Sequence, residues 1–139
     1  MGLLAVKAKV DTGAATSALH AFDIRTERDG GALVARFQAH PVRKPARRVV
    51  ECTAPVVDQR EVISSSGHSE LRVVVGTSLR LGTKADAPSW DIELTLTDRQ
   101  LLRFPMLLGR EAMAEHLVVD PAASYLLGRV ADPGVFYPR

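Results

Sequence analysis

Short stretches in which apolar and polar residues alternate recur along most of the chain. The clearest is "WDIELTLT" (residues 90–97), in which every second residue from Trp90 to Leu96 is apolar and the residues between are acidic or threonine. A period of two is typical of a strand that buries one face. "LAVKAKVD" (residues 4–11) repeats the alternation with lysines on its outer face, and "ALVARFQ" (residues 32–38) is also β-prone. Each of these three segments predicts a strand.

Less regular segments extend the β pattern. "REVISSSGHSELRVVV" (residues 60–75) places two β-prone runs around a Ser-Ser-Ser-Gly centre, which predicts a hairpin with a flexible tip. Three prolines and a cluster of basic residues predict irregular structure between positions 40 and 58. Short strands are also predicted at residues 77–81, 104–109 and 124–127.

One segment has a helical period. In "REAMAEHL" (residues 110–117) the residues Ala112, Met113, His116 and Leu117 share a face. The last residues, 128–139, predict a loose tail. Several short strands with one small helix indicate a mostly-β barrel or sandwich, organised as one domain over residues 1–127 followed by the tail.

The composition is that of an ordinary globular domain, with 46% hydrophobic and 24% charged residues among 139. A formal net charge of +2 is too small to argue for a nucleic-acid partner. The first ten residues are interrupted by Lys7 and Lys9, which predicts neither a signal peptide nor a membrane span. We therefore expect a cytoplasmic protein without nucleic-acid or membrane partners.

Other charged and metal-binding residue types give weaker signals. The basic run "RKPARR" (residues 43–48) fits either a solvated loop or a patch for an acidic partner. Cys52 is the only cysteine, which excludes an internal disulfide, and we expect a packed thiol. None of the four histidines has the i, i+4 spacing that a zinc-binding helix requires, so we expect no metal and no cofactor. They are His20, His40, His68 and His116.

The motif Asp11-Thr12-Gly13 follows the first predicted strand and carries the candidate chemistry. A carboxylate that activates water for amide hydrolysis needs a partner in the complementary protonation state. Two carboxyl groups about 3 Å apart share one proton and supply base and acid together. An isolated Asp-Thr-Gly is also a common turn, in which the aspartate caps its own backbone.

Two segments together resemble the retropepsin-like aspartic proteases. In that family a strand leads into Asp-Thr-Gly-Ala, and a later apolar pair followed by Gly and often Arg opens a helix. Residues 11–14 and "LLGR" (residues 107–110) match these two features. Several blocks look most like the bacterial group labelled ATP-dependent zinc proteases, which is associated with a glutamate ligase that modifies a ribosomal protein. The blocks are "KAKVDTGAATSALHA", "SSSGHSELR", "LTLTDR", "MLLGREAM" and "SYLLG".

The resemblance implies a closed acid-protease β-barrel with one short C-terminal helix and one lobe per chain. It implies that Asp11 is catalytic with Thr12 and Gly13 in support. It further implies a flap over the site at the hairpin tip. The flap residues are Ser64, Ser65, Ser66, Gly67 and His68, and the supporting residues beneath the loop are Ala14, Gly109 and Arg110.

One departure from the family pattern affects Arg110. Relatives usually carry an Asp shortly after the motif to pair with the arginine that opens the helix. Here Ala15 and Thr16 stand in those positions. We therefore expect the partner of Arg110 to be Asp23, Glu111 or a backbone carbonyl.

A single Asp-Thr-Gly in a chain of this length implies a twofold homodimer that shares one site. The expected function is aspartic-type endopeptidase activity on peptide bonds, with an acidic, glutamate-rich or isopeptide substrate considered. Two alternatives stay open: a non-catalytic dimeric peptide-binding module, and a zinc-dependent hydrolase.

Overall fold

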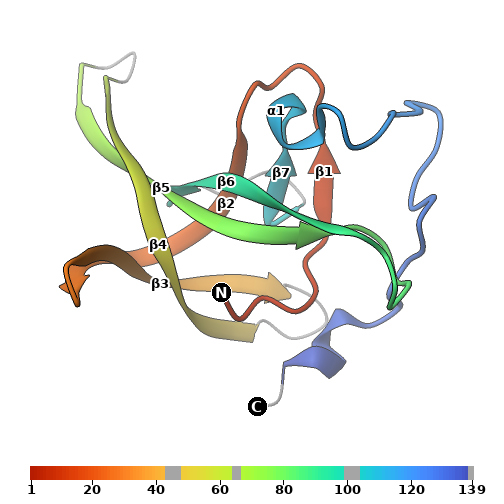
Figure 1. Cartoon of the computed structure of the whole chain (residues 1–139), viewed down its shortest axis with the longest axis horizontal. Helices are drawn as coiled ribbons and strands as arrows, with labels where there is room; N and C mark the ends of the chain where they lie inside the picture. Colours follow the sequence, from red (N-terminus) through yellow and green to blue (C-terminus); the bar gives the residue numbers. More distant parts are fainter. Residues whose placement is uncertain (43–47, 64–66, 99–103, 138–139) are drawn as a thin grey trace.

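The computed structural model describes residues 1–42, 48–63, 67–98 and 104–137. Most of the basic run and the tip residues Ser64, Ser65 and Ser66 lie outside these ranges. Within them the chain forms seven strands, one α-helix and one 3-10 helix (Figure 1). In chain order these are β1 (Ala8–Val10), β2 (Ser17–Asp29), β3 (Ala32–Val42), β4 (Arg48–Ile63), β5 (Ser69–Arg80), β6 (Ser89–Thr97), β7 (Met106–Leu108), α1 (Arg110–Met113) and η1 (Pro133–Phe136).

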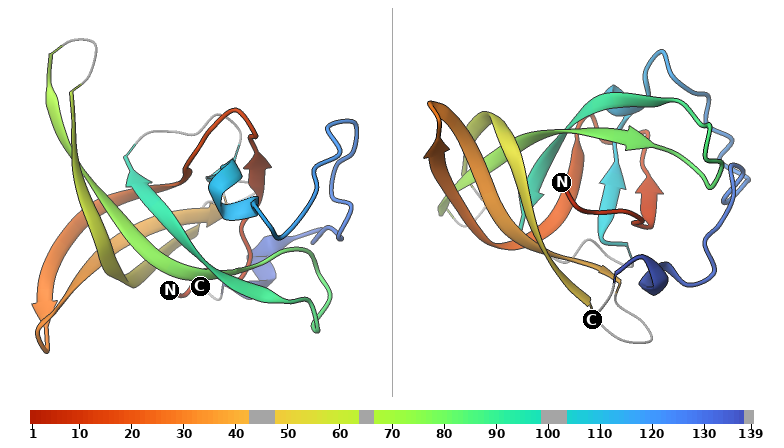
Figure 2. Two further views of the ribbon diagram at one scale, coloured as in Figure 1. Left: turned by 45° about the horizontal axis from the view of Figure 1, so that its top comes forward. Right: turned by 60° about the horizontal axis from the view of Figure 1, so that its bottom comes forward.

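The seven strands form one sheet that curves back on itself. Their order is β1-β7-β2-β3-β4-β5-β6, and an additional parallel pairing of β2 with β6 brings the two parts of the sheet together. The views in Figure 2 show the resulting partly closed barrel, with the β4–β5 hairpin projecting from it. The mostly-β, single-lobe fold that the sequence predicts is confirmed.

The core fills the inside of this sheet. Its most deeply buried large side chains include Leu19 of β2, Phe37 of β3, Leu94 of β6 and Leu108 of β7. The predicted alternation of β6 holds from Asp91 to Leu96. It fails at Thr97, which is also buried, as is His20, its register partner in β2.

The prediction of irregular structure from residue 40 to 58 is wrong for the residues described. β3 continues to Val42 and β4 begins at Arg48. Pro41 falls where the β3–β4 register shifts, between Ala39 and Val42. Pro55 is the last β4 residue paired with β3, and the β5 pairing starts at Val56. Prolines are tolerated at such interruptions because their missing N–H is not needed there.

The helix is shorter than predicted. α1 ends at Met113 because Ala114 leaves the helical conformation and Glu115 has a positive φ of 67°. The strand predicted at residues 124–127 is absent: Tyr125 has a φ of 54°, and a turn joins the Gly128 N–H to the Tyr125 carbonyl. Both predictions fail for the same local reason: each segment contains a residue whose backbone has the left-handed conformation, with a positive φ.

The predicted loose tail is also wrong for residues 128–137. η1 lies there, and Tyr137 beyond it is buried. Its hydroxyl accepts from the Ala5 N–H at 2.7 Å and donates to the Ala5 carbonyl at 2.6 Å. The C-terminal segment is thus fastened to the segment that leads into β1. No helix in the described part of the chain has the length and apolar character to cross a membrane.

Candidate active site

Asp11 stands immediately after β1, in the loop that connects β1 to β2. β1 pairs in parallel with β7, and the Asp11 N–H continues this pairing by donating to the Leu108 carbonyl at 2.9 Å. The Oδ1 atom of Asp11 accepts from the Gly13 N–H at 3.0 Å, and the Ala14 N–H donates to the Asp11 carbonyl. The side chain is partly exposed. The loop therefore fixes one carboxylate oxygen while keeping the group at the surface.

Helix α1 holds this loop from the other side. The Arg110 N–H donates to the Ala14 carbonyl at 2.9 Å, and the Glu111 N–H donates to the Ala15 carbonyl at 3.0 Å. The first N–H groups of a helix have no acceptors within the helix, so carbonyl groups of the loop accept their hydrogen bonds. Figure 1 shows α1 beside the loop between β1 and β2.

Gly109 makes this approach possible. Its N–H donates to the buried Ser17 Oγ at 2.9 Å. A Cβ on Gly109 would lie 2.4 Å from the Thr16 carbonyl oxygen and 3.0 Å from that of Ala14. Because these are backbone atoms of the Asp11 loop, only glycine fits without moving the loop.

The Arg110 side chain braces the same loop. Its Nη1 donates to the Gly13 carbonyl at 3.3 Å and lies 3.5 Å from the Thr12 carbonyl. Of the three partners expected for Arg110, the structure therefore shows the backbone carbonyl. Asp23 lies in β2, and the Glu111 carboxylate faces a cleft on another side of α1.

The loop presents one carboxylate per chain. In the part of the chain that the structure describes, the hydrogen bonds of Asp11 all involve backbone groups, those of Gly13, Ala14 and Leu108. None of these hydrogen bonds involves another acidic side chain of the described residues. The described loop therefore shows one of the two carboxyl groups that an aspartic dyad needs.

The β4–β5 hairpin is where the flap was predicted. Arg60 to Ile63 pair with Arg72 to Ser69, so the predicted hairpin is confirmed for these residues. Gly67 and His68 are exposed just before β5. Ser64, Ser65 and Ser66 lie outside the described residues.

Histidines that are distant in sequence meet in the fold. His20, Phe22 and His40 stack, with 4.6 Å between the ring centroids of Phe22 and His40. His116 stacks on Trp90 at 4.3 Å. Over the described residues, no three His, Cys, Asp or Glu side chains are grouped as metal ligands. Cys52 is buried, as expected of a packed thiol, and burial raises its pKa to about 11.

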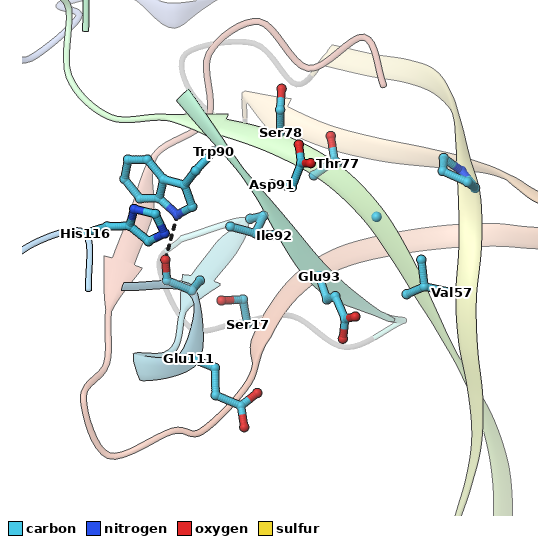
Figure 3. A pocket seen from close by; sticks show the side chains of 13 residues that line it. Ser17, Val57, Thr77, Ser78, Trp90, Asp91, Ile92, Glu93, Glu111 and His116 are labelled. Atoms are coloured by element: carbon cyan, nitrogen blue, oxygen red, sulfur yellow. Dashed lines mark hydrogen bonds between the residues drawn. The ribbon is translucent and has the colours of Figure 1, made fainter. Parts of the chain in front are cut away.

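Sequence reasoning missed a cleft between α1 and the β5–β6 strands (Figure 3). Its volume is about 640 Å³, and it does not include Asp11. The outward-facing acidic residues of "WDIE" are the part of the sequence that could have indicated this cleft. Nothing in the sequence, however, indicated that α1 lies opposite them. Its lining residues include Trp90, Asp91, Glu93, Glu111 and His116.

The curved single-lobe sheet and the clamped Asp-Thr-Gly loop define a retropepsin-like lobe. Residues 2–129 match the family described as "Retropepsin-like aspartic endopeptidase RimB", and the chain belongs to this RimB-like family. A crystal structure of a protein with unknown function from Legionella pneumophila is similar, with a TM-score of 0.66 and 30% identity; the match covers 88% of this chain and 84% of that one.

Curated relatives extend beyond this lobe. A probable alpha-L-glutamate ligase from Desulfotalea psychrophila is 49% identical over 132 residues, which cover 94% of this chain and 27% of that protein. A protein of the same description from Shewanella pealeana is 42% identical, with 95% and 28% covered. The chain therefore spans about a quarter of the length of these curated relatives.

Proposed function

We propose that this chain is one half of an aspartic peptidase, in which two copies related by a twofold axis each contribute one Asp11. The observation that carries the proposal is the clamped loop. α1 and β7 fix its backbone, Gly13 fixes Oδ1, and the carboxylate remains partly exposed. Such a group is rigid enough to face an identical group across an axis.

The dyad would act on a bound water. Two adjacent carboxyl groups share one proton, so one accepts a proton from the water as it attacks the amide carbon. The other donates its proton to the leaving amine, and no covalent intermediate forms. Thr12 and Gly13 would support the loop. The hairpin, with Ser64, Ser65, Ser66, Gly67 and His68 near its tip, would close over an extended peptide and pair with its backbone.

The names of the relatives suggest a substrate class. They are called probable alpha-L-glutamate ligases, and most of their length lies outside the segment matched here. A peptidase lobe joined to such a ligase would act on glutamate-rich peptides or isopeptides, in the compartment where the ligase works. We place that compartment in the cytoplasm.

Replacing Asp11 by Asn tests the chemistry. We expect cleavage of oligo-glutamate and of a peptide library to be lost, with Asp29→Asn as a control of equal charge change at the exposed end of β2. Retained cleavage in Asp11→Asn would refute the aspartic mechanism. Loss of wild-type cleavage with a chelator alone would favour a zinc-dependent hydrolase, and binding without cleavage by the wild type would favour a peptide-binding module.

Mixing the two proteins tests the shared site. Only a dimer of two wild-type chains has a complete dyad, and random pairing makes such dimers about a quarter of an equal mixture. The mixture should therefore retain about a quarter of the activity of wild-type protein at the same total concentration. A monomer with its own complete site would retain about half. Sedimentation velocity on the same samples should show a dimer, and full activity from monomers would exclude the model.

A further inference from the structure

Two arginines lie opposite each other in the β4–β5 hairpin. Arg60 of β4 and Arg72 of β5 are register partners, and directly opposed residues of a sheet share a face. Like charges in such a pair repel each other and destabilise the hairpin unless negative charge compensates them. Whether each arginine has a carboxylate partner therefore decides what this pair can bind.

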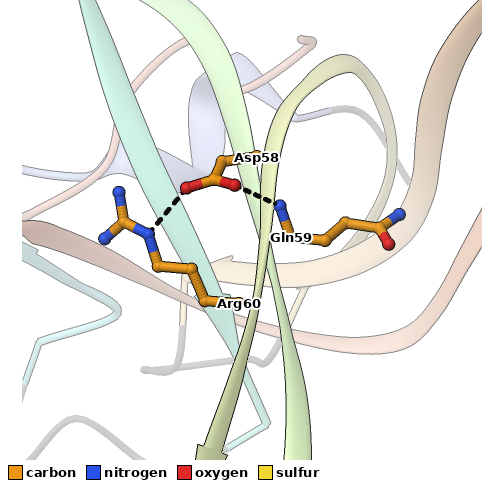
Figure 4. Close-up of polar contacts among 3 residues, drawn as sticks. All are labelled: Asp58, Gln59 and Arg60. Carbon is orange, nitrogen blue, oxygen red and sulfur yellow. Dashed lines mark hydrogen bonds and ion pairs between the residues drawn. The ribbon is translucent and has the colours of Figure 1, made fainter.

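Arg60 has such a partner. Its Nε donates to Asp58 Oδ2 at 2.7 Å, while Asp58 Oδ1 accepts from the Gln59 N–H at 2.8 Å (Figure 4). The hydrogen bond to Asp58 and the charge of this carboxylate raise the pKa of Arg60. Figure 4 shows Asp58 and Arg60 on one side of β4, with the side chain of Gln59 pointing away from them. One carboxylate of the protein thus compensates one of the two guanidinium groups.

Arg72 has no such partner among the described residues. It is half-buried, and its Nε is fully buried without a hydrogen-bond acceptor in the described part of the chain. The ion pair of Asp58 with Arg60 does not extend to it. A buried donor without an acceptor costs free energy, and more so when it carries charge. The arginine pair therefore has one carboxylate fewer than it can bind.

The face that carries the arginine pair continues to the strand that leaves the Asp11 loop. Arg72 and Val74 are two residues apart in β5, so they share a face. Val74 pairs with Thr95 of β6, and Thr95 pairs with Ala18 at the start of β2. From the usual spacings in a sheet, Arg72 and Ala18 lie about 12 Å apart along it. About four residues of an extended peptide span that distance.

Two other carboxylates limit where an acidic group can bind on this face. After Asp58, the charges of Glu93 in β6 and Glu111 in α1 contribute to the raised pKa of Arg60. Both glutamates are exposed, and they would repel a carboxylate that approached Arg60 from the side of α1. Arg72 is therefore the member of the pair that is available to an acidic ligand.

We propose that Arg72, with Arg60 opposite it, forms a subsite that binds the carboxylate of an acidic side chain in the substrate. The inference rests on the proposed function, in which the hairpin closes over an extended peptide. A guanidinium binds a carboxylate through two parallel N–H groups, which fixes both its charge and its orientation. A glutamate of the substrate would thus supply the acceptor and the negative charge that Arg72 lacks.

Binding of fluorescein-labelled oligo-glutamate to Asp11→Asn protein, followed by anisotropy, tests the subsite without cleavage. We expect saturable binding that Arg72→Gln weakens about tenfold, and no binding of oligo-glutamine. Arg80→Gln is the matched control, because it removes the same charge at the far end of β5 and should leave binding unchanged. Equal weakening by the two variants, no effect of Arg72→Gln, or equal binding of the two peptides would overturn the proposal.

Asp58→Asn tests the subsite in the opposite direction. Without the charge of Asp58, Arg60 is also available to the peptide, and oligo-glutamate should bind about threefold more tightly. A purely structural role of the ion pair gives no gain, so unchanged or weaker binding would refute the subsite. Normal binding by Arg72→Gln with loss in Arg43→Gln, Lys44→Gln would assign the acidic peptide to the basic run instead.

Activity measurements separate this inference from the proposed function. If oligo-glutamate binds as expected but the wild type cleaves no peptide, the peptidase proposal fails and the arginine subsite stands. If the wild type cleaves peptides, replacing their glutamates one at a time by glutamine should lower kcat/KM about tenfold at one position, and Arg72→Gln should abolish this preference. Equal kcat/KM for all of these peptides would remove the subsite and leave the peptidase proposal standing.

Discussion

Cys52 illustrates how the fold changes the chemistry of a single residue. Its side chain is 1% exposed, between Phe37 across the β3–β4 ladder and the rest of the core. Removing water from around the thiol disfavours the thiolate, which raises the pKa from 9.0 to about 11. At neutral pH the group is a packed, uncharged side chain, and it is poorly suited to act as a nucleophile.

The raised pKa of Cys52 also makes the free energy of unfolding depend on pH above about pH 9. The unfolded chain releases the Cys52 proton near pH 9, whereas the folded chain keeps it to about pH 11. Between these values the unfolded state binds fewer protons, so the free energy of unfolding falls as the pH rises. We expect the stability advantage of wild type over Cys52→Ala, measured by urea unfolding, to be constant from pH 7 to 8.5 and to shrink by about 2 kcal/mol toward pH 11. A constant difference across the whole range would contradict this.

At the scale of elements, α1 and the Asp11 loop stabilise each other. A helix of four residues is not stable alone, because nucleation costs more than so few hydrogen bonds return. α1 persists because its first N–H groups bind Ala14 and Ala15 and the Gly109 N–H binds Ser17. The loop in turn receives the partners that its carbonyl groups need.

Gly109→Ala should break this mutual support. Its new Cβ would meet the Thr16 carbonyl, a backbone group that cannot rotate away, and we expect a loss of about 2–4 kcal/mol in the free energy of unfolding. Gly76→Ala is the matched control: its Cβ would meet only the end of the exposed Val57 side chain, so the loss should stay below about 1 kcal/mol. Similar losses in denaturant unfolding of the two variants would contradict the account.

Sequence patterns predicted elements that bury one face and missed those that do not. β6 alternates, so its period is visible; at the start of β2, Leu19, His20 and Ala21 are all buried, and no period appears. β4 changes partner from β3 to β5 near Pro55, a tertiary event that a local proline signal cannot convey. The cleft depends on where α1 packs, so no local pattern could predict it.

At the scale of the whole molecule, the two ends of the chain are joined. The Tyr137 hydroxyl bridges the N–H and carbonyl of Ala5, three residues before β1 begins. Figure 2 shows the N- and C-terminal segments at the same side of the barrel. The C-terminal turn at residues 133–137 therefore steadies the approach to β1, the strand that ends just before Asp11.

Tyr137→Phe should remove this bridge while keeping the ring. The Ala5 backbone groups would lose their partner in a part-buried setting, and we expect a loss of about 1–2 kcal/mol in the free energy of unfolding together with faster proteolysis of the C-terminal segment. Tyr125→Phe is the control, because Tyr125 is exposed and its ring contact with Arg129 needs no hydroxyl. Equal stability of wild type and Tyr137→Phe would show that the bridge does not hold the tail.

The pairing of β1 with β7 also sets an order in time. The carbonyl that accepts the Asp11 N–H belongs to Leu108, which is made nearly a hundred residues after Asp11. Contacts between such distant segments form slowly, because a long loop must close before they contribute. During synthesis, the Asp11 loop therefore cannot form its native hydrogen bonds until β7 and α1 have emerged from the ribosome. A chain that has been made only as far as β6 has the Asp-Thr-Gly motif without these supports, so the candidate active site forms only after β7 and α1 have been made.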